Sequence, residues 1–141
     1  MIASHPYCPD VDSLVALLRF RAENEPDRLG YSFLVDGERA DDRTWSQLDT
    51  RVRAIAAWLQ AHEEPGARVL LMFEEGHEYL EALYACMYAK LLAVPVHPPD
   101  PRRLHRTLPR LLSICGDAGV TVVLRWACMS VSTQFVYCSH Y

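Results

Sequence analysis

The sequence lacks any long apolar run and any excess of positive charge. Its 141 residues carry 14 Lys and Arg against 18 Asp and Glu, which gives a formal net charge of −4. This balance argues against nucleic acid as the main partner, because phosphate binding needs clustered positive charge. No apolar run approaches the roughly 18 residues that a membrane-spanning helix needs, so we expect no membrane span.

Paired cysteines and a signal peptide are missing as well. The five cysteines form no CxxC pair and are odd in number, which favours free thiols in a reducing compartment over a disulfide framework. Cys86 and Cys115 fall on predicted buried helix stripes, where thiols are inert. The N-terminus has no basic start followed by an apolar run, so we expect a cytoplasmic protein. The six histidines lack metal-ligand spacing with cysteine or with one another.

Glycine is sparse, and its six occurrences form neither GxGxxG nor GxxxxGK[ST]. Glu74 and Glu75 precede Gly76 at the expected start of a helix. Two carboxylates at that position stabilise the helix dipole but repel a phosphate. The sequence therefore offers no cradle for a nucleotide phosphate at this turn.

A strand–helix–strand unit over residues 68–103 is the strongest structural signal that is present. Val69 to Phe73 is an unbroken apolar run, and such runs are typical of strands covered on both faces in parallel sheets. Glu78 to Leu91 has apolar residues at helical spacing, and Ala93 to Val96 is a second short strand. The helix between them is long enough for a right-handed parallel crossover. Its inward stripe is expected to comprise Leu80, Leu83, Tyr84, Met87 and Leu91.

Before this unit, the sequence predicts a helix and a β-hairpin. Asp10 or Asp12 is expected to cap a helix that runs to about Asn24. Its inward residues should be Leu14, Leu17, Leu18 and Ala22. Residues 29–35 and 38–44 are the arms of the hairpin, joined at Asp36-Gly37, which is a strong two-residue turn signal. The second arm is charged, so we expect it at an edge that faces water.

A second amphipathic helix should follow the hairpin. Thr44 and Gln47 have the spacing of a capping box, in which each side chain satisfies a backbone donor of the other residue. The buried stripe of this helix is expected to be Leu48, Val52, Ile55 and Leu59. Pro65-Gly66 then separates the helix from the first core strand.

Beyond the central unit, a second crossover helix and a third apolar strand are predicted. The helix carries Leu104, Leu108, Leu111, Leu112 and Cys115, and the strand runs from Val120 to Leu124. Pro109 is expected to mark the first turn of a separate helix, because a mid-helix proline costs about 3 kcal/mol. The element order predicts the α/β class, with a three-layer parallel β-α-β-α-β sheet preceded by a helix, a β-hairpin and a second helix.

Two groups of residues are candidates for function. His97 follows a strand end, where ligand crevices form in open α/β sheets, although the flanking prolines explain an exposed loop equally well. Arg102, Arg106 and Arg110 are spaced by four and could form an anion-binding face. Such a row is more often the solvated side of an amphipathic helix, and we favour that interpretation.

The order of these segments resembles a known family. Residues 29–44, followed by TWSQLDTRVRAIAAWLQ and RVLLMFEEGHEYLEALYACMYAKLLAVPVHPP, resemble the N-terminal opening of the fatty acyl-AMP ligases. These are acyl-adenylate-forming members of the superfamily of AMP-dependent synthetases and ligases. The likeness runs from about Leu14 to Leu124. AVPVHPP is its most specific feature, and RLLSICGDAGVTVVL agrees with the next segment of that family.

The resemblance implies an activity that this chain is not equipped to perform alone. Such enzymes activate a fatty acid with ATP and Mg²⁺ to an acyl-adenylate, which is passed to an acyl carrier protein in polyketide, lipopeptide or lipid assembly. The family's Ser/Thr/Gly-rich phosphate loop, its acidic and aromatic motifs and its C-terminal lysine do not occur in this sequence. We therefore carry over no catalytic, cofactor-binding or metal residue, and we expect an inactive N-terminal fragment.

Two departures from the family pattern concern the central unit. Lys90 stands where the family has glycine at the end of the helix, and if that position is left-handed the lysine costs about 1 kcal/mol. Glu74 and Glu75 replace the usual prolines before Gly76, which changes the entry to the helix.

The expected organisation has three parts. Residues 1–9 form a loose N-terminus, residues 10–125 an incomplete N-terminal α/β subdomain of an AMP-binding domain, and residues 126–141 a divergent tail. The tail contains no Asp, Glu, Lys or Arg. It could be one more strand, and an uncovered, β-prone segment of this kind is also an aggregation risk.

Two alternatives to the inactive fragment remain open at this point. One is a small non-enzymatic interaction module whose exposed sheet edge meets a partner protein. The other is a small enzyme that uses His97 and the arginine row. Whichever interpretation holds, an incomplete sheet should leave apolar surface uncovered, so we expect the isolated chain of 141 residues to be poorly soluble or to self-associate through an exposed sheet edge.

Overall fold

The computed structural model describes residues 9–74 and 76–125, so the divergent tail and nearly all of the expected loose N-terminus lie outside the described residues. The described part contains α1 (Leu14–Asn24), β1 (Leu29–Val35), β2 (Glu38–Thr44), α2 (Trp45–His62), β3 (Arg68–Met72), α3 (His77–Tyr88), β4 (Leu92–Val96), the short 3₁₀ helix η1 (Pro101–Arg103), α4 (Leu104–Ala118) and β5 (Val120–Arg125). This order confirms the predicted α/β class.

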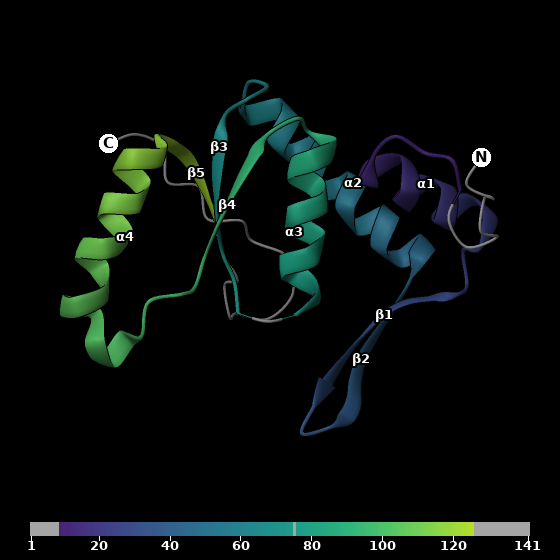
Figure 1. The fold of residues 1–141 in the computed structure, drawn as a ribbon, viewed down its shortest axis with the longest axis horizontal. Coiled ribbons are helices and arrows are strands. Elements are labelled where there is room, and N and C mark those ends of the chain that lie inside the picture. The colour runs from purple at the N-terminus through teal and green to yellow at the C-terminus, as the bar shows by residue number, and fades with distance from the viewer. Residues whose placement is uncertain (1–8, 75, 126–141) are drawn as a thin grey trace.

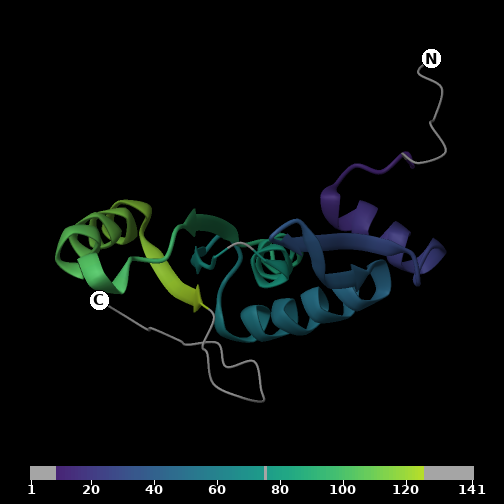
Figure 2. The same cartoon turned by 90° about the horizontal axis from the view of Figure 1, so that it is seen from below.

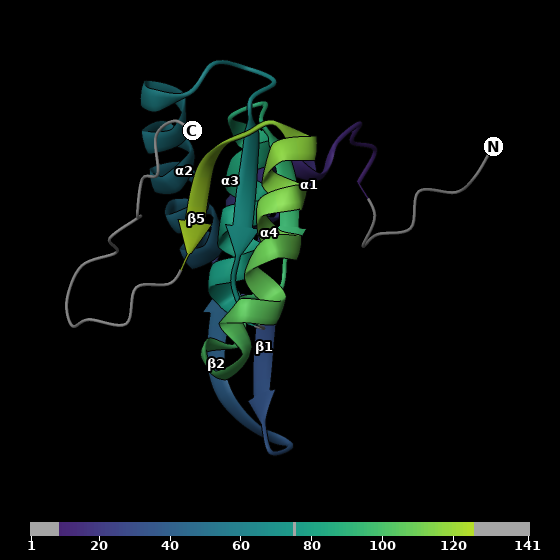
Figure 3. The same ribbon diagram turned by 90° about the vertical axis from the view of Figure 1, so that its left-hand side faces the viewer.

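A three-stranded parallel sheet lies at the centre of the fold, in the order β4-β3-β5. Figure 1 shows α3 on one side of this sheet and α4 on the other, so that the layers predicted from the sequence are present. Val69 and Leu71 of β3 are fully buried in one cluster with Val122 and Leu124 of β5 and with residues of α2 and α3. Figures 2 and 3 show that α1, α2 and the hairpin extend from the α3 side.

The β1–β2 hairpin forms where it was predicted. Asp36 and Gly37 have φ values of 53° and 82°, the two positive angles of a type I′ turn, whose twist matches that of the flanking strands. The charged second arm is only partly an edge that faces water. Asp41 and Arg43 of β2 lie against α3, and the side chain of Arg43 is 29% exposed.

Local signals set the starts of the first two helices, and one prediction about them is wrong. The capping box is confirmed: Gln47 N donates to Thr44 Oγ1 at 3.3 Å, and Thr44 N donates to Gln47 Oε1 at 3.0 Å. The buried stripe of α2 comprises the four predicted residues together with Ala56. By contrast, α1 is capped by Ser13 and by neither predicted aspartate, since Ser13 Oγ accepts the hydrogen bond of Ala16 N at 3.1 Å. Leu14 at its first position is 52% exposed.

The inward face of α3 differs from the predicted one. Its most deeply buried residues are His77, Glu81, Ala82, Ala85 and Cys86, and the predicted large residues Leu80, Leu83, Tyr84 and Met87 are only half-buried. The helix packs against both α2 and the sheet. Close approach to two neighbours favours small side chains at the innermost positions, and the large side chains then fill the flanks. Hydrophobicity alone therefore indicated the wrong stripe.

Helix α4 corrects two further predictions. It runs without a break through Pro109, so the proline does not start a separate helix; its ring removes one backbone donor from the helix. The predicted buried side is largely open as well. Leu104, Leu108 and Leu112 are 43%, 38% and 55% exposed, and no residue of α4 is fully buried.

Lys90, just beyond the end of α3, adopts the left-handed conformation. Its φ is 59°. Leu91 N donates to Cys86 O at 2.8 Å and Lys90 N donates to Met87 O at 3.2 Å, which is the hydrogen-bond pattern of a Schellman motif. A lysine at this position strains the backbone, because its Cβ approaches the neighbouring carbonyl oxygen.

We expect Lys90→Gly to stabilise the protein by about 1 kcal/mol, because glycine adopts positive φ without this penalty. Denaturant unfolding of both proteins measures the difference. Lys90→Ala is the matched control, since it removes the charge and keeps the strained Cβ. An equal gain in Lys90→Ala would show that the charge, not the backbone, is responsible.

Candidate functional site

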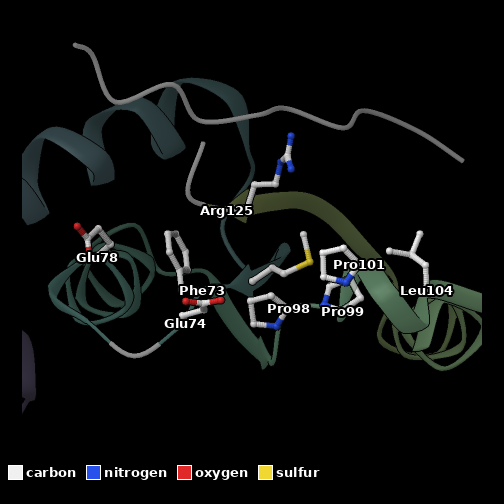
Figure 4. A pocket seen from close by; sticks show the side chains of 9 residues that line it. Phe73, Glu74, Glu78, Pro98, Pro99, Pro101, Leu104 and Arg125 are labelled. Atoms are coloured by element: carbon white, nitrogen blue, oxygen red, sulfur yellow. The ribbon is translucent and has the colours of Figure 1, made fainter. Parts of the chain in front are cut away.

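A crevice opens at the carboxyl ends of the three parallel strands. It has a volume of about 510 Å³ and is lined by Met72, Phe73, Glu74, Glu78, Pro98, Pro99, Pro101, Leu104 and Arg125. Figure 4 shows the labelled side chains around the crevice. They come from the segment after β3, the end of β5, the first turn of α3, the proline-rich connector and the start of α4. Open α/β sheets bind ligands at this edge, and the sequence predicted a crevice here.

The charges around the crevice do not suit a nucleoside triphosphate. Among the described residues, two carboxylates, Glu74 and Glu78, line it with a single cation, Arg125. Glu78 lies in the first turn of α3, and its Oε2 atom is 2.9 Å from the point that a Cβ on Gly76 would occupy. A carboxylate at the N-terminus of a helix interacts favourably with the positive end of the helix dipole, and its charge repels a second anion. The residues described at this crevice therefore do not fit ATP.

The structure does not bring His97 and the arginine row together at the crevice. His97 follows β4 directly and does not line the crevice. Arg102, Arg106 and Arg110 are exposed, along η1 and α4, and none of them lines it. The interpretation of this row as a solvated helix side fits these exposures better than an anion-binding face.

The described cysteines are poor nucleophiles. Cys86 and Cys115 are both free. Cys86 is fully buried, and burial raises the pKa of its thiol to about 12. Cys115 is half-buried, and burial raises the pKa of its thiol as well. A raised pKa lowers the thiolate fraction at neutral pH, and the thiolate is the reactive form. Cys8, Cys128 and Cys138 lie outside the described residues.

A buried polar cluster joins the hairpin to α3, and the sequence did not predict it. His77 and Glu81, one turn apart on α3, are each only 2% exposed. The Nε2 atom of His77 lies 3.0 Å from the backbone oxygen of Asp41. Glu81 faces two cations, with Arg43 Nε 3.6 Å from its Oε1 and Arg51 Nε 3.5 Å from its Oε2. Strand β2, helix α2 and helix α3 thus meet at one charged contact.

Aromatic side chains of β1 make two more contacts with α3. The ring of Phe33 meets that of His77 edge-on, with centroids 4.7 Å apart. The hydroxyl groups of Tyr31 and Tyr84 lie 3.2 Å apart, and burial together with this hydrogen bond raises the pKa of Tyr84. Figure 1 shows the hairpin reaching beyond the body of the molecule, and these contacts with α3 hold it along the part from Tyr31 to Phe33 and from Asp41 to Arg43.

Spacing along α3 was the signal that could have revealed the cluster. His77 and Glu81 stand at positions i and i+4 before Ala85 and Ala89, and all four are buried. Residues at this spacing share one face of a helix. Because the two alanines lie on the inward face, the histidine and the glutamate lie there too, and buried polar groups of this kind need partners inside the protein. Within residues 9–74 and 76–125, no group of three or more His, Cys, Asp or Glu side chains could hold a metal ion. No helix of this part of the chain is long and apolar enough to cross a membrane.

Comparison with known proteins identifies one matching family and relatives that are similar over most of this chain. The AMP-binding enzyme family matches residues 18–136. The medium-chain-fatty-acid–[acyl-carrier-protein] ligase JamA of Moorena producens is 42% identical over 117 residues, which cover 82% of this chain and 20% of JamA. Disco-interacting protein 2 of Drosophila melanogaster is 35% identical over 114 residues, which cover 79% of this chain and 6% of that protein.

A solved structure shows the same arrangement of elements. The fatty acyl-adenylate ligase from L. pneumophila, in complex with acyl adenylate and pyrophosphate, superimposes with a TM-score of 0.76 and 36% identity over 84% of this chain. The match covers 20% of the ligase. The present chain thus spans about a fifth of the length of the ligases that it matches, and its fold corresponds to their N-terminal part.

Proposed function

Because the chain belongs to the AMP-binding enzyme family, we propose that it corresponds to the N-terminal part of a fatty acyl-AMP ligase. The observation that carries this proposal is the identity of 42% with a fatty-acid–[acyl-carrier-protein] ligase over 82% of this chain. In this proposal residues 10–125 form the first α/β subdomain of an AMP-binding domain. Its full-length counterpart would activate a fatty acid with ATP and Mg²⁺ and pass the acyl group to a carrier protein.

The chain alone is proposed to be inactive. Transition-state stabilisation in phosphoryl and adenylyl chemistry needs donors and cations placed around the reacting phosphate. The described lining of the crevice at the strand ends offers one arginine against two glutamates, and helix α3 presents the Glu78 carboxylate at its N-terminus. What this segment contributes to the family's reaction is therefore a scaffold.

We expect the isolated chain to exchange pyrophosphate into ATP no faster than a protein-free blank does, whichever fatty acid is added. The measurement is a radiolabelled pyrophosphate exchange assay with a series of fatty acids and Mg²⁺, and the L. pneumophila ligase serves as the active control. Equilibrium dialysis against ATP tests whether the chain binds ATP at all, and it does not depend on turnover. Exchange above the blank, or tight ATP binding, would contradict the proposed inactivity.

A chimera tests whether the segment is a competent N-terminal part. In JamA, the matched 117 residues are replaced by the matching residues of this chain. If the scaffold role holds, the chimera forms acyl-adenylate. A second chimera that carries Lys90→Gly restores the family glycine at the left-handed position and serves as the control for local strain. Loss of activity in both chimeras, with the fold intact by circular dichroism, counts against the proposal.

An interaction module is the second candidate function. The observation in its favour is the 35% identity with Disco-interacting protein 2, a relative whose name refers to an interaction. Under this alternative the chain acts through a protein contact and needs no ATP. A pull-down that yields one stoichiometric partner favours it, whereas active chimeras favour the ligase proposal.

A further inference from the structure

Two neighbouring cavities lie where α1 packs against α2, away from the crevice at the strand ends. Their volumes are about 480 Å³ and about 370 Å³, and both are lined by Arg19 of α1 and Arg53 of α2. Sites for small molecules in proteins have volumes of roughly 300–1,000 Å³. Each cavity is therefore large enough for a small organic ligand.

The two cavities differ in the charges that line them. Among the described residues, the smaller cavity has two carboxylates, Glu23 and Asp49, beside the shared arginines. The described lining of the larger cavity contains the same arginines and no Asp or Glu, and its other members are Tyr88, Gln60 and three alanines of α2. The chain as a whole has a net charge of −4, so this cavity is a local exception. Cations without opposing carboxylates in a concave site favour a negatively charged ligand.

Neighbouring side chains hold both arginines in place. The Cζ atom of Arg19 lies 4.9 Å from the centroid of the Tyr88 ring. The Tyr88 hydroxyl donates to Asp49 Oδ1 at 2.6 Å, and Arg53 Nη1 lies 3.7 Å from Asp49 Oδ2. The Asp49 side chain is only 15% exposed, so these two contacts partly compensate its charge. A guanidinium group carries more N–H donors than such contacts use, which leaves donors for a ligand.

We propose that the larger cavity binds a small organic oxyanion, whose carboxylate or phosphate head contacts Arg19 and Arg53. The planar fork of an arginine matches the oxygen atoms of both kinds of head group. The apolar body of the ligand contacts the alanines and the Tyr88 ring. Ala54 and Ala57 are exposed, so the cavity is accessible from solvent. This site is separate from the proposed ligase relationship, since its ligand needs neither ATP nor turnover.

The test is a titration of the full-length chain with n-butyl phosphate and with butyrate, followed by the NMR signals of the backbone amides at constant ionic strength. We expect saturable shifts at the residues that line the cavity with at least one of the two anions, and the comparison shows which head group is preferred. n-Butylamine has the same apolar body with a positive charge and should give no saturable shift. The absence of saturable shifts with both anions, or equal shifts with the amine, overturns the proposal.

Variants of the lining test whether the anion binds at this cavity. Arg19→Gln and Arg53→Gln are each expected to weaken binding about tenfold, because each removes a charge-assisted contact. Ala57→Glu keeps both arginines and adds a carboxylate to the cavity, and Ala57→Gln is its neutral control of equal size. We expect about tenfold weaker binding in the glutamate variant than in the glutamine variant. Ala57 is exposed, so this pair decides the case if circular dichroism shows an arginine variant to be unfolded.

An arginine elsewhere on the surface provides the control for general attraction of anions. Arg106 is exposed on α4 and lines neither cavity, so Arg106→Gln should bind the anion as wild type does. Binding that Arg106→Gln weakens and the variants of the cavity do not would place the anion on the arginine row of α4. Equal binding in all variants would mean that the anion binds without a defined site. Either result overturns the proposal.

Discussion

Replacing Leu71 by alanine is expected to destabilise the protein by about 3–4 kcal/mol. Leu71 is fully buried in the central strand β3 and belongs to the cluster that joins the sheet to α2 and α3. Truncation of such a leucine loses the transfer free energy of its side chain and leaves a cavity, which together cost about 2–5 kcal/mol. Small domains have a total stability of about 5–15 kcal/mol, so this single change removes a large share.

The matched control for this prediction is Leu112→Ala on α4. The same atoms are removed there, but Leu112 is 55% exposed, so a change within about 0.5 kcal/mol is expected. Urea unfolding followed by circular dichroism measures both variants. A cost below about 1 kcal/mol for Leu71→Ala, or an equal cost for both, would mean that the core does not lie between the sheet and α2–α3.

Replacing Arg43 by alanine is expected to cost about 2 kcal/mol, because it leaves a buried carboxylate with one cation instead of two. Glu81 is 2% exposed, and its Oε1 atom accepts no hydrogen bond among the described residues. Arg43 Nε at 3.6 Å is the cation that faces this oxygen. Removing one member of a buried ionic group is costly because a charge is left with too little compensation. Arg51 still faces Oε2, so the loss is smaller than for an isolated pair.

A double-mutant cycle separates this effect from a simple loss of side-chain packing. Glu81→Leu replaces the buried charge with an apolar group of similar volume, a change that is often neutral or stabilising. In that background Arg43→Ala should cost less than about 0.5 kcal/mol. Arg53→Ala is the control for an exposed pair, since the Arg53 side chain is 68% exposed and lies 3.7 Å from Asp49. An equal cost of Arg43→Ala in both backgrounds would contradict the ionic explanation.

The candidate crevice was predictable in place but not in composition. Parallel strands end at one edge of a sheet, so residues after β3, β4 and β5 had to gather there, and His97 is a candidate on that ground. The side chains that line the crevice include Phe73, Glu78 and Arg125, and His97 is not among them. Which side chains face a crevice depends on the rotation of each strand end and on the path of the connector, and neither is encoded in spacing alone.

The sequence by itself determined the features that depend on neighbouring residues. The capping box at Thr44 and the turn at Asp36-Gly37 each arise within a few residues, and the buried stripe of α2 follows from its helical spacing. The three apolar runs formed the parallel strands as predicted. Local backbone geometry and hydrophobic periodicity indicate such elements without knowledge of distant contacts.

Only the tertiary structure decided which faces of α3 and α4 are inside. Helix α3 lies between α2 and the sheet, so small residues and the polar pair His77 and Glu81 are buried there in place of the larger apolar side chains. Helix α4 keeps a regular apolar row, yet within the described residues nothing covers it fully. Burial depends on what lies opposite a side chain, and residues far apart in the chain supply that neighbour.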